Sequence, residues 1–246
     1  MKRLFISLAI LAGISLSSCN DSFLEKTPVT DLTENNAFNS YDNFKAFMWP
    51  CYEMFTNNTI RTSLQGFGQD GQYKGDMAAG YFQQKYESGY NEFAYQTVAS
   101  VASGNGWDFK SFIRRVNIML SHIDNSSMTE AQKDHWRAVG YFFHSFWYME
   151  LIDRFGDVPW VDQVLQEDSP EAYGPRVDRK TVADKVLERL QWAEQNIGNF
   201  TSQDGDNTIN QDCVRAVISR FGLREGTWRK YHELGDAEKY LQECVR

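Results

Sequence analysis

The chain has 246 residues, a formal net charge of −8 and 42% hydrophobic residues, which fits a folded globular protein with a sizeable core. The acidic balance argues against a nucleic-acid-binding protein, which needs a basic face, and no internal stretch is long and apolar enough to span a bilayer. Aromatic residues make up 15% of the chain, so it needs either a large core or a stacking surface for a ligand.

Residues 1–18 are typical of a secretory signal peptide. Two basic residues precede an apolar run from Leu4 to Leu16, and two serines then lead to Cys19. This order resembles the bacterial lipobox, in which the cysteine is acylated and becomes the mature N-terminus. We therefore expect a lipid anchor on Cys19, and several acyl chains would make that anchor stable. The alternative is an ordinary signal that happens to end near a cysteine.

The next segments predict a tether, a helix and a long loop. Residues 19–40 are polar and form the predicted tether. Apolar residues at helical spacing predict a helix over 41–55, with a kink or break near Pro50. Residues 56–106 are rich in Gly, Asn, Gln and Tyr and follow no sustained period, so we expect an irregular loop, a feature that is usually functional when it is this long.

The rest of the chain is patterned as helices. The apolar spacing predicts them over about 107–123, 129–155, 179–197, 210–228 and 236–246. Thr129 and Gln132 form a capping-box pattern, and Gly156 followed by Pro159 predicts where that helix stops. Residues 141–149 are aromatic nearly all round, so this helix should be buried on several sides. We find no credible run of strands and predict an all-α fold.

The last two predicted helices fit a tetratricopeptide-like pair. Large and small residues fall roughly at the packing positions of that repeat, at Phe221, Trp228, Ala237, Leu241 and Cys244. This interpretation makes Cys244 a buried, inert thiol. If Cys19 is acylated, the three remaining cysteines cannot all pair, so separate buried thiols at 51, 213 and 244 are favoured over a single bridge. No further helix follows to cover the last predicted helix, 236–246, which indicates a truncated protein.

Catalytic and metal sites are not expected. Acidic pairs such as Asp204/Asp206 and Asp153/Asp157 are best explained as solvated residues or helix caps in a chain with 33 acidic residues. The segment 204–207 lacks the glycine and the final acid of a calcium loop. The basic run 229–232 is interpreted as the solvated end of a helix. No motif for a cofactor appears, and we predict none.

Ligand binding is expected from aromatic residues in the long loop. Sugars present C–H faces that stack on rings, and their hydroxyls pair with amides and carboxylates. Tyr73, Tyr86 and Tyr90 lie among glutamines and asparagines and are the candidate ligand-binding residues. Trp107, at the junction of the loop and the next helix, is a possible anchor, with a core role as its alternative.

Several segments resemble the SusD/RagB family of outer-membrane nutrient-binding lipoproteins. The resemblance is carried by Cys19–Tyr52, by Trp107–Asn117 with its Trp-x4-Phe-Ile-x3-Asn pattern, by Arg137–Trp160, and by Ser219–His232. It implies a tetratricopeptide-like scaffold over 41–246 that captures glycans or other nutrients at the cell surface. It also implies a SusC-like TonB-dependent transporter as partner and a location on the outer membrane. Members of this family are longer, and their C-terminal half is absent here.

Three functions follow in order of preference. The first is a non-enzymatic lipoprotein that binds an oligosaccharide or other nutrient and delivers it to the transporter. An interaction scaffold for the transporter with no ligand of its own is the second. A glycoside-degrading enzyme is the last.

Overall fold

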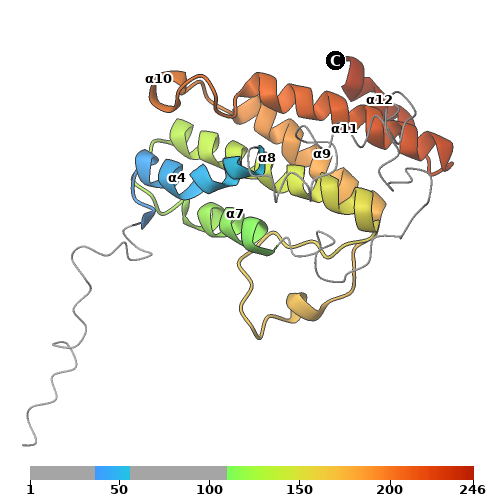
Figure 1. Cartoon of the computed structure of the whole chain (residues 1–246), viewed down its shortest axis with the longest axis horizontal. Helices are drawn as coiled ribbons and strands as arrows, with labels where there is room; N and C mark the ends of the chain where they lie inside the picture. The colour runs from blue at the N-terminus through green and yellow to red at the C-terminus, as the bar shows by residue number, and fades with distance from the viewer. Residues whose placement is uncertain (1–36, 56–109) are drawn as a thin grey trace, which may run out of the picture. The chain divides into compact units, whose positions relative to one another are not determined.

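The computed structural model describes residues 37–55 and 110–246, and within these ranges the chain is mostly helical (Figure 1). The chain divides into a unit of residues 1–37 and a unit of residues 38–246, and all the helices named below belong to the second unit. Strand pairing in the described ranges is confined to one antiparallel bridge between Val158 and Val177. The predicted all-α class is therefore confirmed. None of the described helices combines the length and hydropathy needed to cross a bilayer.

The first described helix confirms the predicted interruption. Helix α4 covers Tyr41–Met48 and continues as the 3-10 helix η1 over Trp49–Phe55. The Ser40 side chain caps α4 by accepting a hydrogen bond from the backbone N–H of Asn43. Pro50 has no N–H to donate and its ring crowds the preceding turn, so the α-helical bonding pattern ends just before it.

Helices α7 (Lys110–His122) and α8 (Glu130–Phe155) are joined by a short turn. The predicted capping box is present, because the Thr129 hydroxyl accepts from the Gln132 N–H while the Gln132 side chain accepts from the Thr129 N–H at 3.0 Å. Helix α8 ends at Gly156, whose φ of 67° is favourable for glycine alone. Both predicted boundaries of α8 are therefore confirmed.

Helix α8 is the centre of the core. It contacts α7, α9 (Arg179–Asn196) and α11 (Gln211–Tyr231), so it is covered on several sides as its aromatic run predicted (Figure 1). Phe143 and Trp147 are 0% and 7% exposed. This long aromatic helix holds together the two layers formed by α7 and by α9 with α11.

Helix α12 (Ala237–Val245) packs closely against α11 as a helical pair. A Cβ atom added to Gly222 would lie 2.5 Å from the Tyr240 carbonyl oxygen, and one added to Gly226 would lie 2.7 Å from Leu241 Cγ. The two backbones can approach this closely only because both positions are glycines.

The predicted packing positions of this pair are partly wrong. Phe221 is fully buried as predicted, but Trp228 is 42% exposed and Cys244 is half-buried. The close contacts are made by Gly222 and Gly226 instead, and Tyr240 fills the space between the helices. Trp228 therefore lies on the outer face of α11, where Arg179 and His232 contact its ring.

Arg229 corrects the prediction that the basic run 229–232 is a solvated helix end. Helix α11 continues past Trp228 to Tyr231, so Arg229 is internal to it and its side chain is 0% exposed. Its Nε donates to Glu225 at 2.8 Å, and its Nη2 donates to Tyr240 at 3.0 Å and to Asp184 at 3.2 Å. These bonds connect α11 to α9 and α12 through a buried guanidinium.

Two short helices lie in segments that the periodicity left unassigned. They are η2 (Pro170–Tyr173), between α8 and α9, and α10 (Thr201–Asp204), between α9 and α11. Each is a single turn, too short to leave a helical period in the sequence.

Two buried groups on α8 predict opposite responses to pH. Burial, and to a lesser degree the positive charge of Arg189, lowers the pKa of His144. On acidification this imidazole therefore binds a proton more readily in the unfolded chain than in the folded one, so stability falls as the pH drops below about 6.5. Burial raises the pKa of Glu150 to about 7, so the folded chain holds this proton longer and stability falls as the pH rises from 4.5 toward 7.

Urea midpoints at about pH 7.5 and about pH 5 measure both contributions, each worth at most about 1.4 kcal/mol per pH unit. We expect His144→Gln to lessen the loss of stability on acidification and Glu150→Gln to increase it. Equal pH responses for the two variants and the parent would show that neither group titrates differently in the folded state.

Candidate functional site

The residues predicted to carry function lie outside the described part of the chain. These are Cys19 for lipidation and Tyr73, Tyr86, Tyr90 and Trp107 for ligand binding. They stay predictions. The described residues nevertheless hold several cavities whose chemistry can be compared.

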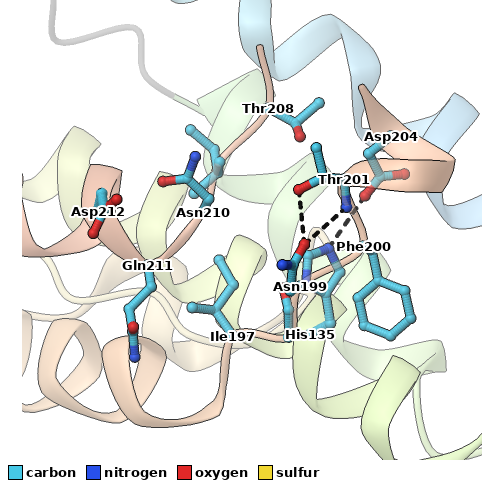
Figure 2. A pocket seen from close by; sticks show the side chains of 12 residues that line it. His135, Ile197, Asn199, Phe200, Thr201, Asp204, Thr208, Asn210, Gln211 and Asp212 are labelled. Atoms are coloured by element: carbon cyan, nitrogen blue, oxygen red, sulfur yellow. Dashed lines mark hydrogen bonds and ion pairs between the residues drawn. The ribbon is translucent and has the colours of Figure 1, made fainter. Parts of the chain in front are cut away.

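One of these is the α10 pocket, a cavity of about 370 Å³ formed by the start of α8 and the connection from α9 to α11 (Figure 2). It is lined mainly by polar side chains of the segment 197–212, with Phe200 as its aromatic residue. Polar groups of this kind suit a hydroxyl-rich ligand, provided that they are free to bind one.

A largely buried charge cluster forms part of the lining of the α10 pocket, which includes Asp204 and His135. Asp204 accepts a hydrogen bond from the Tyr41 hydroxyl, its Oδ1 lies 3.4 Å from Lys45 Nζ, and its Oδ2 lies 3.5 Å from His135 Nε2. Burial lowers the pKa of His135, although the Asp204 carboxylate opposes this. The Asp204 side chain is 5% exposed, so the prediction that it is solvated is wrong.

Asp204 is buried by contacts between elements that are far apart in the chain. Tyr41 and Asp204 are 163 positions apart, and helix α4 brings its tyrosine against the turn of α10. Local sequence shows only an acidic, glycine-containing turn. Its partners come from distant helices, and no signal in the sequence identifies them.

Most polar groups of the α10 pocket are already hydrogen-bonded within the protein. Asn199 accepts from the N–H and the hydroxyl of Thr201, Asn210 caps α11, and the Gln211 amide donates to the Glu194 carbonyl (Figure 2 shows the Asn199–Thr201 bonds). His135 donates from Nδ1 to the Gly198 carbonyl at 3.1 Å. These bonds hold the connection between α9 and α11 in place, so the pocket is primarily structural.

A second cavity, of about 270 Å³, lies over α8 and α9 and contains three aromatic residues, Tyr141, Trp160 and Trp192. The Arg189 guanidinium lies 4.9 Å from the ring centroids of both Tyr141 and Trp160, and Lys185 Nζ lies 5.3 Å from that of Trp160. Cations therefore occupy ring faces that a sugar would need for stacking.

Two of the segments that carry the family resemblance meet in space. The Asn117 side chain on α7 donates to the carbonyls of Val161 and Gln163, which follow the Arg-Phe-Gly-Asp-Val-Pro-Trp segment that ends at Trp160. Tyr148 of α8 donates to the Pro159 carbonyl and accepts from the Val161 N–H. Asn117, Pro159 and their neighbours therefore hold the connection between α8 and α9 against the core.

The cysteine prediction is confirmed in part: Cys51, Cys213 and Cys244 are free thiols, but only Cys51 is buried. Burial raises the pKa of the Cys51 thiol to about 12, which makes it unreactive. Cys213 and Cys244 are only half-buried. Within the described residues, no group of histidines, cysteines and carboxylates is arranged to hold a metal ion.

Comparison with known proteins gives a consistent result. The SusD-like family model described as "Starch-binding associating with outer membrane" matches residues 22–223. A SusD-like protein from Bacteroides fragilis NCTC 9343 shares the fold with a TM-score of 0.59 and 17% identity, over 90% of this chain and 41% of its own. No curated protein matches the sequence.

Two further solved structures agree. A SusD-like carbohydrate-binding protein from Bacteroides vulgatus ATCC 8482 has a TM-score of 0.59 and 17% identity, over 85% of this chain and 45% of its own. A laminarin-binding SusD-like protein has a TM-score of 0.52 and 17% identity, over 84% of this chain and 43% of its own. The chain thus spans less than half the length of these relatives. Because the family model covers most of its sequence, the chain belongs to the SusD-like family.

Proposed function

We propose that this protein is a non-enzymatic, lipid-anchored receptor that captures glycans at the cell surface and delivers them to a TonB-dependent transporter. The observation that carries the proposal is the match of residues 22–223 to a family described as starch-binding and associated with the outer membrane. The shared fold with a laminarin-binding SusD-like protein supports a polysaccharide as the ligand.

Tyrosines of the predicted loop supply the first test. Alanine at Tyr73, Tyr86 or Tyr90 should weaken binding of laminarin or starch by about 0.5–1.5 kcal/mol each, the range for one aromatic contact. The melting temperature should barely change, because a ligand-facing ring adds little to the core. Native gels cast with each polysaccharide measure binding as retarded migration. Tyr231→Ala, at an aromatic that is 80% exposed on α11, is the matched control.

The outcomes separate the alternatives. Variants that unfold would assign these tyrosines to packing and remove them from the site. If the variants fold and neither they nor the parent chain are retarded in any glycan gel, glycan binding is excluded. The remaining function is then the scaffold, in which the protein binds only the transporter.

Anchoring gives an independent prediction. Cys19→Ala should abolish incorporation of labelled fatty acid and shift the protein from the membrane fraction to the soluble fraction, because the acyl chains supply its stable attachment. Cys51→Ala, at a buried thiol, is the control and should stay in the membrane fraction. Unchanged labelling of the Cys19 variant would refute the anchor.

A further inference from the structure

A cavity larger than the two described above lies away from the α10 pocket. A groove of about 740 Å³ runs between α7 and the connection from α8 to α9, which includes η2. This volume is in the range of small-molecule and oligosaccharide sites. Its floor is apolar and is formed by Ile113, Pro159, Val161 and Leu165. We call it the η2 groove.

The wall of the η2 groove is fixed before any ligand arrives. Arg114 of α7 donates to the Leu165 carbonyl at 2.7 Å, and Asn117 donates to the carbonyls of Val161 and Gln163. The base of the connection is closed by the bridge between Val158 and Val177. A preformed wall spares a ligand the entropy of ordering a loop.

The rim of the η2 groove presents an available aromatic ring. Tyr173 is 80% exposed, and its hydroxyl donates to the Glu167 carbonyl at 2.9 Å. That bond restrains the ring without covering its faces. The rings of two other aromatic residues are already engaged. Arg189 and Lys185 lie over Trp160, and Arg179 and His232 contact Trp228. Of these three exposed or half-buried aromatics, Tyr173 is the one suited to stack on a sugar.

Polar groups on the rim are also available. Within the described residues, no hydrogen bond engages the side-chain amides of Gln163 and Gln166 or the carboxylates of Glu167 and Glu171, all of which line the groove. Amides both donate to and accept from hydroxyls, and carboxylates accept from them in charge-assisted bonds. An apolar floor, one open ring and free polar side chains together match the two kinds of surface on a sugar.

The charge of the rim selects among glycans. Arg114 is the cationic side chain of the lining, against the carboxylates of Glu167 and Glu171, and Asp168 is exposed beside them. The negative groups of uronic acid or sulfated sugars would be repelled by these carboxylates. Neutral sugars instead offer hydroxyls that donate hydrogen bonds to them.

We propose that the η2 groove is a binding subsite for a neutral oligosaccharide, with Tyr173 as its stacking residue and Gln163, Gln166, Glu167 and Glu171 as its hydroxyl partners. This inference rests on the proposed function and names a site formed by residues other than the predicted loop tyrosines.

Binding of a laminarin oligosaccharide and of a uronic acid oligosaccharide of equal length to the full chain tests the proposal. Tyr173→Ala should weaken laminarin binding about threefold to tenfold and leave the melting temperature unchanged. Tyr231→Ala, equally exposed, should alter neither quantity. The double change Glu167→Gln and Glu171→Gln should raise affinity for the uronic acid oligosaccharide, because it removes the like charges.

Failure of the inference and failure of the proposed function are distinguishable. If the parent binds laminarin and Tyr173→Ala binds it equally well, the η2 groove is not a subsite although the receptor function stands. A Tyr173→Ala chain that keeps its glycan affinity but loses the transporter in co-purification would make the groove a protein contact and overturn the inference. If the parent binds neither oligosaccharide, the receptor function fails and the subsite fails with it.

Discussion

Replacing Phe143 with alanine is expected to lower the free energy of unfolding by about 3–5 kcal/mol, the usual cost of truncating a buried aromatic. Phe143 is 0% exposed in the middle of α8. Its ring lies edge-on to Tyr52 and Phe142, with centroids 5.1 Å and 5.5 Å away, and 6.2 Å from that of Phe55. Alanine would leave a cavity between α8 and η1 that these rings cannot fill without moving.

Denaturant unfolding followed by circular dichroism measures this loss. Tyr231→Ala is the control, since it removes an aromatic ring that is 80% exposed and should change stability by less than about 0.5 kcal/mol. A midpoint for the Phe143 variant equal to that of the parent would show that α8 is not the core helix.

The second large effect concerns the buried guanidinium. Arg229→Met should cost about 1–3 kcal/mol or more, because it removes one of the two cations that pair with the Glu225 carboxylate, which is 1% exposed and keeps Arg179 Nη1 at 2.7 Å. Asp184 and Tyr240 would also lose hydrogen bonds from Arg229. The contact between α9, α11 and α12 should therefore loosen first.

A double change distinguishes a lost ion pair from lost packing. Arg229→Met combined with Glu225→Met removes both charges. Arg179 then loses its contact with Glu225 and keeps Asp153 as a partner at 3.8 Å. The double variant should lose less stability than the sum of the two single changes, since each single change already breaks the contact between Arg229 and Glu225. A double variant that loses the sum of both single effects would mean that the two residues contribute independently.

Helix positions could be predicted because their signals are local. The Thr129 capping box, the Gly156 stop and the aromatic run of α8 each act within a few residues, and all are confirmed. Pro50 likewise ends the α-helical pattern of α4 within one turn. Such features depend on backbone hydrogen bonding and steric contact, which neighbouring residues determine.

Burial of charged residues could not be predicted in the same way. The sequence predicts Asp204 and Arg229 to be surface residues because the segments around them are polar. Their partners, Tyr41 for one and Asp184 for the other, come from elements far away in the chain. A helical period identifies the apolar face of one helix but not the groups that another helix places opposite it. The predicted ligand residues lie outside the described ranges and stay predictions.

Direct titration of the purified chain with neutral glucans is the measurement that tests the receptor function most directly. Calorimetric titration with laminarin and starch oligosaccharides should give saturable binding, and Tyr173→Ala and Tyr73→Ala should each weaken it while the melting temperature holds. Absence of binding heat for every neutral glucan at millimolar concentration, from a chain that melts cooperatively, would contradict glycan capture by this scaffold.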